Sequence, residues 1–97
     1  MLEDFLDTDM ASADAKKLAK AMCSVMKDIR LSSINENTGK PLSIRHVCSL
    51  KDMDISILSR AENPNEDTVP ALSYWLDWCE ALNVDLGDIV KKAKQII

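Results

Sequence analysis

One segment constrains the fold more than any other: residues 43–63, SIRHVCSLKDMDISILSRAEN, which predict two short helices joined by a tight turn. Ser43 is a favourable N-cap, because its hydroxyl can accept a hydrogen bond from a backbone N–H in the first turn. Asp52 tolerates the left-handed conformation that a tight turn requires, and Asp54 can cap the second helix. The two helices are expected at about residues 43–51 and 54–62.

This segment resembles the helix-turn-helix of the Xre family, the class of the phage Cro proteins and lysogeny repressors. The family pattern has an N-cap, a small residue, a tight turn, a buried aliphatic residue and an acid, and these positions hold Ser43, Cys48, Asp52, Leu58 and Glu62. The downstream segment NPNEDTVPALSYWLDWCEALNVDLGDIV resembles the fourth and fifth helices of the family. The resemblance covers about residues 20–90. It implies an all-α, five-helix, lambda-repressor-like DNA-binding domain with a central helix-turn-helix.

Length and composition lead to a compatible fold class. The chain has 97 residues, which supply one hydrophobic core and therefore one domain. Hydrophobic residues make up 46% of it, only two residues are glycine, and no segment alternates as a strand would, so we expect a helical bundle. Residues 1–12 are expected to form an acidic, mobile arm, and residues 13–97 a single helix-turn-helix domain whose C-terminal helices serve the core and dimerisation.

The cysteines and the N-terminus indicate the compartment. Cys23, Cys48 and Cys79 occur singly at apolar positions, without CxxC spacing, which indicates reduced core thiols in a cytoplasmic protein. The acidic start MLEDFLDTDM lacks the basic residues of a signal peptide, and no apolar run reaches the length of a membrane span. We therefore expect a cytoplasmic protein that does not enter a membrane.

Charge is distributed unevenly along the chain, although the net charge is −4. Residues 1–14 carry five acids and no base, whereas residues 15–62 carry nine Lys or Arg against five acids. Residues 63–97 carry three Lys against six acids. The positive segment contains the predicted helix-turn-helix, and a local positive patch favours phosphate even in an acidic protein. The alternative is ordinary scatter of surface charge.

The remaining elements follow from caps, breakers and apolar spacing. Apolar residues at spacings of three and four predict a first helix, capped by Ser12 or Asp14 and ending near residue 32. The segment 35–41, NENTGKP, predicts a turn. A fourth helix is expected after a Thr68 cap, with an apolar stripe formed by Leu72, Trp75, Leu76, Cys79 and Leu82. Asn83 suits its C-terminal cap, and a fifth helix is expected to begin at Asp85.

The family resemblance implies which residues would contact DNA. The start of the second of the two helices would read base edges in the major groove, through Ile55, Ser56, Ser59 and Arg60. Arg60 could bind a guanine in a bidentate manner, and Ile55 could contact a thymine methyl group. The phosphate backbone would be contacted by Ser43, Arg45, His46, Lys51 and Asn63. The chain departs from the family at Ile44, where Gln is common, and at Ile55, where Gln or Arg is common, so specificity is expected to depend on Arg60 and on DNA shape.

Each of these assignments has a structural alternative. Ile55 and Ile57 could be buried against the first helix or a partner, and Arg60 could be a solvated surface residue. Glu62 occupies the position of an acid that pairs, in the family, with an arginine late in the first helix, and Arg30 is the best candidate for that arginine. Such a pair would be structural, because it would join the two helices.

Catalytic and metal chemistry finds little support in the sequence. The single histidine, His46, lies two residues from Cys48, so the two side chains point to different faces of a helix. No Ser-His-Asp set, glycine-rich phosphate loop or paired metal-ligand spacing is present. We therefore expect no enzymatic activity, no cofactor and no metal. Residues expected at a dimer interface are Tyr74, Trp78, Val90 and Ile96.

These observations predict a sequence-specific transcriptional regulator, with a repressor that binds a palindromic operator as a homodimer as the favoured form. The expected partners are double-stranded DNA and a second copy of the chain. The alternative is a protein-interaction module, such as an antitoxin or antirepressor, whose partner would be a toxin or a repressor. The apolar residues Ile44 and Ile55, the acidic termini and the paired tryptophans favour that alternative.

Overall fold

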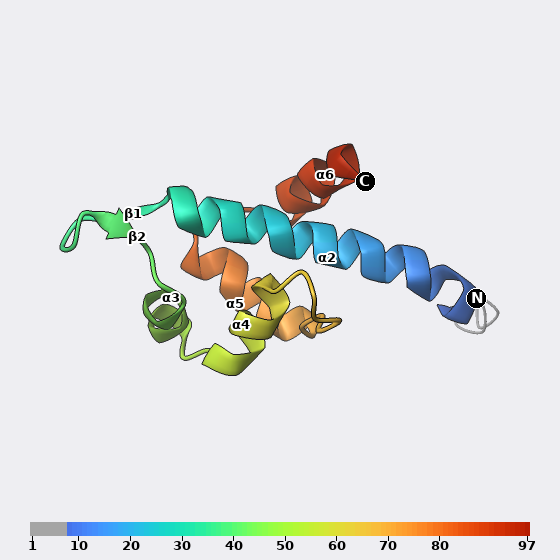
Figure 1. The fold of residues 1–97 in the computed structure, drawn as a ribbon, viewed down its shortest axis with the longest axis horizontal. Helices are drawn as coiled ribbons and strands as arrows, with labels where there is room; N and C mark the ends of the chain where they lie inside the picture. Colours follow the sequence, from blue (N-terminus) through green and yellow to red (C-terminus); the bar gives the residue numbers. More distant parts are fainter. Residues whose placement is uncertain (1–7) are drawn as a thin grey trace.

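A long helix forms the spine on which the other elements pack, as the computed structural model shows (Figure 1). The structure describes residues 8–97, and within them the chain is mostly helical, as the all-α prediction requires, with one short antiparallel hairpin. The elements are α2 (Thr8–Ser32), β1 (Ile34–Asn35), β2 (Lys40–Pro41), α3 (Ile44–Lys51), α4 (Ile55–Glu62), α5 (Leu72–Ala81) and α6 (Leu86–Ile96).

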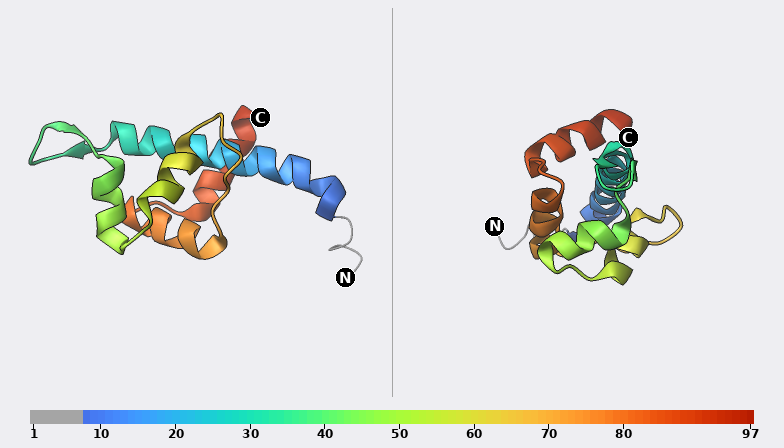
Figure 2. Two further views of the ribbon diagram at one scale, coloured as in Figure 1. Left: turned by 60° about the horizontal axis from the view of Figure 1, so that its bottom comes forward. Right: turned by 90° about the vertical axis from the view of Figure 1, so that its left-hand side faces the viewer.

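The spine helix α2 separates two groups of helices. α6 packs along one side of it, and α3 and α4 lie on the other side, with α5 beside them (Figure 2). Its buried residues recur at helical spacing, since Met22, Val25 and Met26 face the core and Ile29 packs at its edge. The N-terminal turns of α2 extend beyond the other helices (Figure 1). The core therefore surrounds the C-terminal part of α2.

The start of α2 differs from the prediction. The helix begins at Thr8, so residues 8–12, expected in a mobile arm, are helical, and the expected caps Ser12 and Asp14 lie inside the helix. The segment MASADA, residues 10–15, is rich in alanine, the residue with the highest intrinsic helix propensity, which favours the earlier start. The rest of the predicted arm, residues 1–7, lies outside the described residues.

The connection between α2 and α3 is a hairpin rather than a simple turn. β1 and β2 pair antiparallel, with Ile34 opposite Pro41 and Asn35 opposite Lys40. Gly39 has a φ of +70°, and its N–H donates to the carbonyl of Asn35 over 2.8 Å. Glycine adopts this backbone conformation at little cost, so the breaker residues that predicted a turn also shape the hairpin.

α5 begins later than predicted. Thr68 does not cap it: the helix starts at Leu72 after Ala71, whose side chain makes no capping hydrogen bond. Pro70 is buried and lies before the helix. The residue before a proline is disfavoured in the helical region, which agrees with the absence of helix at Val69. Residues 63–71 consequently form a long connection between α4 and α5.

The buried face of α5 also differs from the predicted apolar stripe. Trp75, Trp78 and Cys79 are buried, and the two tryptophan rings stack with their centroids 4.8 Å apart. Leu72 and Leu76, expected in the stripe, are 65% and 51% exposed. The buried face is rotated toward Trp78 because α5 packs against α3 as well as α6.

The two C-terminal predictions are confirmed. Asn83 follows the end of α5 with a φ of 56°, the left-handed conformation common after helix C-termini. Asp85 is the N-cap of α6, and its carboxylate accepts a hydrogen bond from the backbone N–H of Asp88 over 3.2 Å.

Among the described residues, no helix combines the length and the apolar character needed to cross a bilayer.

Candidate nucleic-acid interface

The turn between α3 and α4 is built by the residues that predicted it. The Ser43 hydroxyl accepts a hydrogen bond from the backbone N–H of His46 over 3.0 Å, so Ser43 caps α3. Asp52 ends α3 in the left-handed conformation with a φ of 54°. The N–H of Met53 then donates to the carbonyl of Cys48 over 2.8 Å, which closes the turn. These local interactions confirm the predicted helix boundaries.

Asp54 organises the N-terminus of α4. One of its carboxylate oxygens accepts hydrogen bonds from the backbone N–H groups of Ser56 and Ile57 and from the Ser56 hydroxyl, over 2.8, 3.2 and 2.7 Å. These donors, led by the Ser56 hydroxyl, lower the pKa of Asp54 below its ordinary value. The Tyr74 hydroxyl donates to the backbone carbonyl of Asp54 over 2.8 Å. α5 therefore holds the start of α4.

A buried ion pair holds the other end of α4, as the resemblance implied. Arg30 donates from Nε and Nη2 to the two carboxylate oxygens of Glu62, over 2.8 and 2.7 Å. Its Nη1 donates to the carbonyl of Leu42 over 2.6 Å. Arg30 is 8% exposed and Glu62 6% exposed, and the Glu62 carboxylate raises the pKa of Arg30. The pair joins α2 to the last turn of α4.

A third anchor was missed by sequence reasoning. Lys20, on α2, donates from its ammonium group to the carbonyls of Ala61, Asn63 and Thr68 over 2.9, 3.2 and 3.3 Å. These partners lie 41 to 48 residues away in sequence, and no local pattern in the sequence indicates them. The C-terminal end of α4 and the loop after it are thus held by one lysine.

All four predicted base-contacting residues lie on the exposed side of α4. Ser56, Ser59 and Arg60 are exposed, and Ile55 is 41% exposed, so Ile55 is not buried against another helix. Ile57 is half-buried. Ser56 has its hydroxyl hydrogen committed to Asp54, because an ionised carboxylate can only accept. Their role in DNA binding stays a prediction.

The residues predicted to contact phosphates differ in their exposure. Ser43, Arg45 and Asn63 are exposed, whereas His46 and Lys51 are half-buried. The Lys51 ammonium lies 3.3 Å from a carboxylate oxygen of Glu80 on α5, so it also links α3 to α5. A partly exposed pair of this kind contributes little to stability. The positive charge of Lys51 is thereby partly balanced by Glu80 within the fold.

The predicted dimer residues need correction. Trp78 is fully buried and stacks on Trp75, so it cannot form a subunit contact without unfolding the core. Tyr74 is half-buried, lies edge-on to Trp78 and uses its hydroxyl within the fold. Val90 is half-buried against the core, whereas Ile96 is 62% exposed. Of the four, only Ile96 has a largely free side chain.

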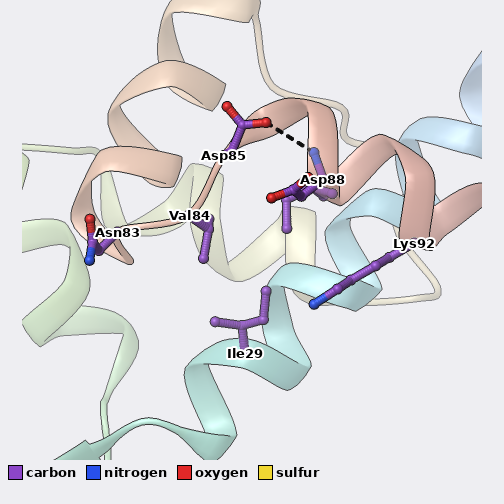
Figure 3. Close-up of a pocket in the computed structure, with 7 residues that line it drawn as sticks. Ile29, Asn83, Val84, Asp85, Asp88 and Lys92 are labelled. Carbon is purple, nitrogen blue, oxygen red and sulfur yellow. Dashed lines mark hydrogen bonds between the residues drawn. The ribbon is translucent and has the colours of Figure 1, made fainter.

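An open pocket of about 530 Å³ lies where the α5–α6 turn crosses α2 (Figure 3). Ile29, Val84 and Ile89 give it an apolar floor, and its polar lining is Asn83, Asp85, Asp88 and Lys92. Asp85 serves there as the cap of α6, drawn as the dashed hydrogen bond in Figure 3. The pocket includes none of the predicted DNA-contacting residues.

The thiols are placed for packing. Cys23, Cys48 and Cys79 are free and buried, and burial raises the pKa of each, that of Cys23 to about 11. A thiol is a weak nucleophile when its pKa is raised. In the described part of the chain, no cluster of three or more His, Cys, Asp or Glu side chains is arranged to hold a metal ion.

Comparisons with known proteins do not assign a family: no protein-family model, curated protein or solved structure matches the chain. The assignment of function therefore depends on the geometry described above.

Proposed function

We propose that this protein is a sequence-specific DNA-binding regulator of the Xre type, which reads the major groove with α4. The observation that supports this proposal best is the contrast between the two sides of α4. One side carries buried residues and a bidentate ion pair to α2, and the other exposes Ser56, Ser59 and Arg60. A helix held rigidly from behind, with polar side chains in front, suits base recognition.

The dimensions of α4 agree with this role. An α-helix with its side chains is about 10–12 Å across and fits the major groove of B-DNA, which is about 12 Å wide, and the eight residues of α4 give about two turns. Arg60 supplies a guanidinium for guanine, while Ser56 and Ser59 supply small polar groups. Ser43 and Arg45, exposed at the start of α3, are suited to the flanking phosphates.

Dimerisation fits the exposed side of α5 better than the residues named from the sequence. Leu72 and Leu76 lie one turn apart and are 65% and 51% exposed. We infer that a second copy covers them, because one helix in one groove gives little affinity and two copies read a palindrome. Repression would follow from occupation of the promoter.

The deciding experiment measures binding of the protein to the DNA upstream of its own gene at about 50 and 200 mM salt. Tight, salt-sensitive binding to one site is expected, and Arg60→Ala should weaken it by about 1–3 kcal/mol. Lys91→Ala is a matched control, because Lys91 is exposed on α6, across α2 from α4 (Figure 2). Binding no tighter than to random DNA contradicts the proposal.

A second candidate is a protein-interaction module, such as an antitoxin or antirepressor. Leu50 and Ile55 are 48% and 41% exposed on the α3–α4 unit, and the exposed acids Asp52 and Asp54 lie between them in sequence. Apolar and acidic groups at this place favour a protein surface over phosphates. This candidate predicts weak, non-specific DNA binding that Arg60→Ala leaves unchanged.

A further inference from the structure

The basic residues of α2 have different environments in the fold. Lys16 and Lys17 are exposed, whereas Lys20 is half-buried and donates to three backbone carbonyls, those of Ala61, Asn63 and Thr68, called here the carbonyl triad. A lysine ammonium has three donor hydrogens, so the triad satisfies its full capacity. Lys20 is therefore not free to contact a phosphate.

The carbonyl triad joins α2 to two neighbouring parts of the chain, the last turn of α4, which the Arg30–Glu62 pair also holds, and the connection that follows it. Ala61 belongs to the last turn of α4, where the carbonyls carry the negative end of the helix dipole, and a cation is stabilising there. Asn63 and Thr68 belong to the connection that follows, which has no regular structure up to α5. One ammonium group thus adds a second contact to the end of α4, beside the Arg30–Glu62 pair, and also holds the residues that follow.

The carbonyl of Asn63 has a further donor. The backbone N–H of Glu66 donates to it over 3.1 Å, and the Asn63 side chain accepts from the N–H of Asn65 over 3.0 Å. Lys20 therefore binds the centre of a small hydrogen-bonded turn. Arg60, a predicted base contact, precedes Ala61 directly, and Asn63 is itself a predicted phosphate contact.

We propose that Lys20 is a positioning residue for DNA recognition, which acts through the carbonyl triad on Arg60 and Asn63. This inference rests on the proposed DNA-binding function. It assigns to Lys20 a role different from that of a surface lysine in the positive segment. Lys20 contributes to DNA affinity by fixing the positions of α4 and Asn63 relative to each other. It neutralises no phosphate.

The test compares Lys20→Met with the wild type and with Lys16→Met, an exposed lysine on the same helix. Lys20→Met is expected to weaken binding to the upstream site about tenfold or more, with the slope of log affinity against log salt unchanged. A lysine that contacts phosphate would instead reduce that slope by about one unit. Lys16→Met is expected to leave the affinity within about twofold.

Chemical restoration of the ammonium group distinguishes loss of the Lys20 contact from a general loss of folding. In Lys20→Cys, alkylation with 2-bromoethylamine gives a side chain of the length of lysine with an ammonium at its end. The native cysteines are buried with raised pKa values, so the reaction is expected to be selective for the new thiol. Alkylation should restore the affinity lost in Lys20→Cys.

Amide hydrogen exchange tests the contact between Lys20 and the carbonyl triad in the absence of DNA. The Glu66 amide should exchange about tenfold faster or more in Lys20→Met than in the wild type, because its acceptor is no longer held. Unchanged exchange, a reduced salt slope in Lys20→Met or no recovery after alkylation would each overturn the proposal. Absence of specific binding by the wild type itself would refute the proposed function, and the exchange result would separate the two failures.

Discussion

Arg30 and Glu62 are joined by two parallel hydrogen bonds, 2.8 and 2.7 Å long, although they lie 32 residues apart in the chain. Both side chains are buried, and Arg30 uses its remaining terminal nitrogen on the carbonyl of Leu42. The pair thereby joins α2, α4 and the residues that lead into α3. Charges buried in this way are stable only while both partners and their hydrogen bonds are present.

Removal of one partner should therefore be costly. Glu62→Ala is expected to lower the free energy of unfolding by about 3–5 kcal/mol, because the Arg30 guanidinium is left buried without its counterion. Urea unfolding followed by circular dichroism measures the change. The double variant Arg30→Met/Glu62→Leu should lose much less than the summed losses of the single variants Arg30→Met and Glu62→Leu. Additive losses would contradict a coupled pair.

The Asp54 cap should make stability depend on pH in the acid range. The folded pKa of Asp54 lies below its ordinary value of 3.8, so the folded state binds fewer protons than the unfolded state in that window. Stability from this group is present above pH 3.8 and is lost as the pH falls through the folded pKa. Asp54→Ser keeps a cap without a charge, so its stability relative to the wild type should improve as the pH falls. A difference in stability between Asp54→Ser and the wild type that does not change with pH would contradict this prediction.

The three cysteines should be unreactive in the folded protein. Their raised pKa values and burial predict that a disulfide reagent at about pH 8 modifies few thiols until the chain unfolds. The number of thiols titrated with and without denaturant measures this directly. Above pH 9 the unfolded chain ionises first, so stability should fall as the pH rises toward about 11. Rapid modification of the thiols in the folded protein would show that the core opens to the reagent.

The exposed leucines of α5 should matter for association and not for folding. Leu72→Ser/Leu76→Ser is expected to shift the chain toward monomer in sedimentation experiments, with little change in its unfolding curve, because neither side chain belongs to the buried core. Leu31→Ser is a matched control, since Leu31 is an exposed leucine on α2. Equal association of all three proteins would exclude this face as the dimer contact.

Local interactions were predictable from the sequence, and several long-range ones were not. Ser43, Asp52 and Asp54 act on backbone groups within a few residues, so their residue types predict the α3–α4 turn directly. The pairing of Arg30 with Glu62 was inferred from the family resemblance. The bonds from Lys20 depend on how α2 crosses the end of α4, and a lysine on a helix gives no sign of such partners.

The misjudged features have a common physical origin. Periodicity places residues on a face of a helix, but it does not say how many neighbours cover that face. α5 is covered by both α3 and α6, so Trp78 is buried and Leu72 is turned outward. The helix ends that were misplaced, at Thr8 and Leu72, depend on alanine content and on Pro70 rather than on a capping side chain.

The stacked pair of Trp75 and Trp78 gives the protein an intrinsic optical probe. These are its only tryptophans, and their rings lie 4.8 Å apart at an interplanar angle of 28°. Two indoles at this separation couple electronically, so the folded core is expected to have an exciton signal in circular dichroism that disappears when the rings separate. Since both rings are buried, that signal should register unfolding while staying silent to events on the exposed faces of α4 and α5.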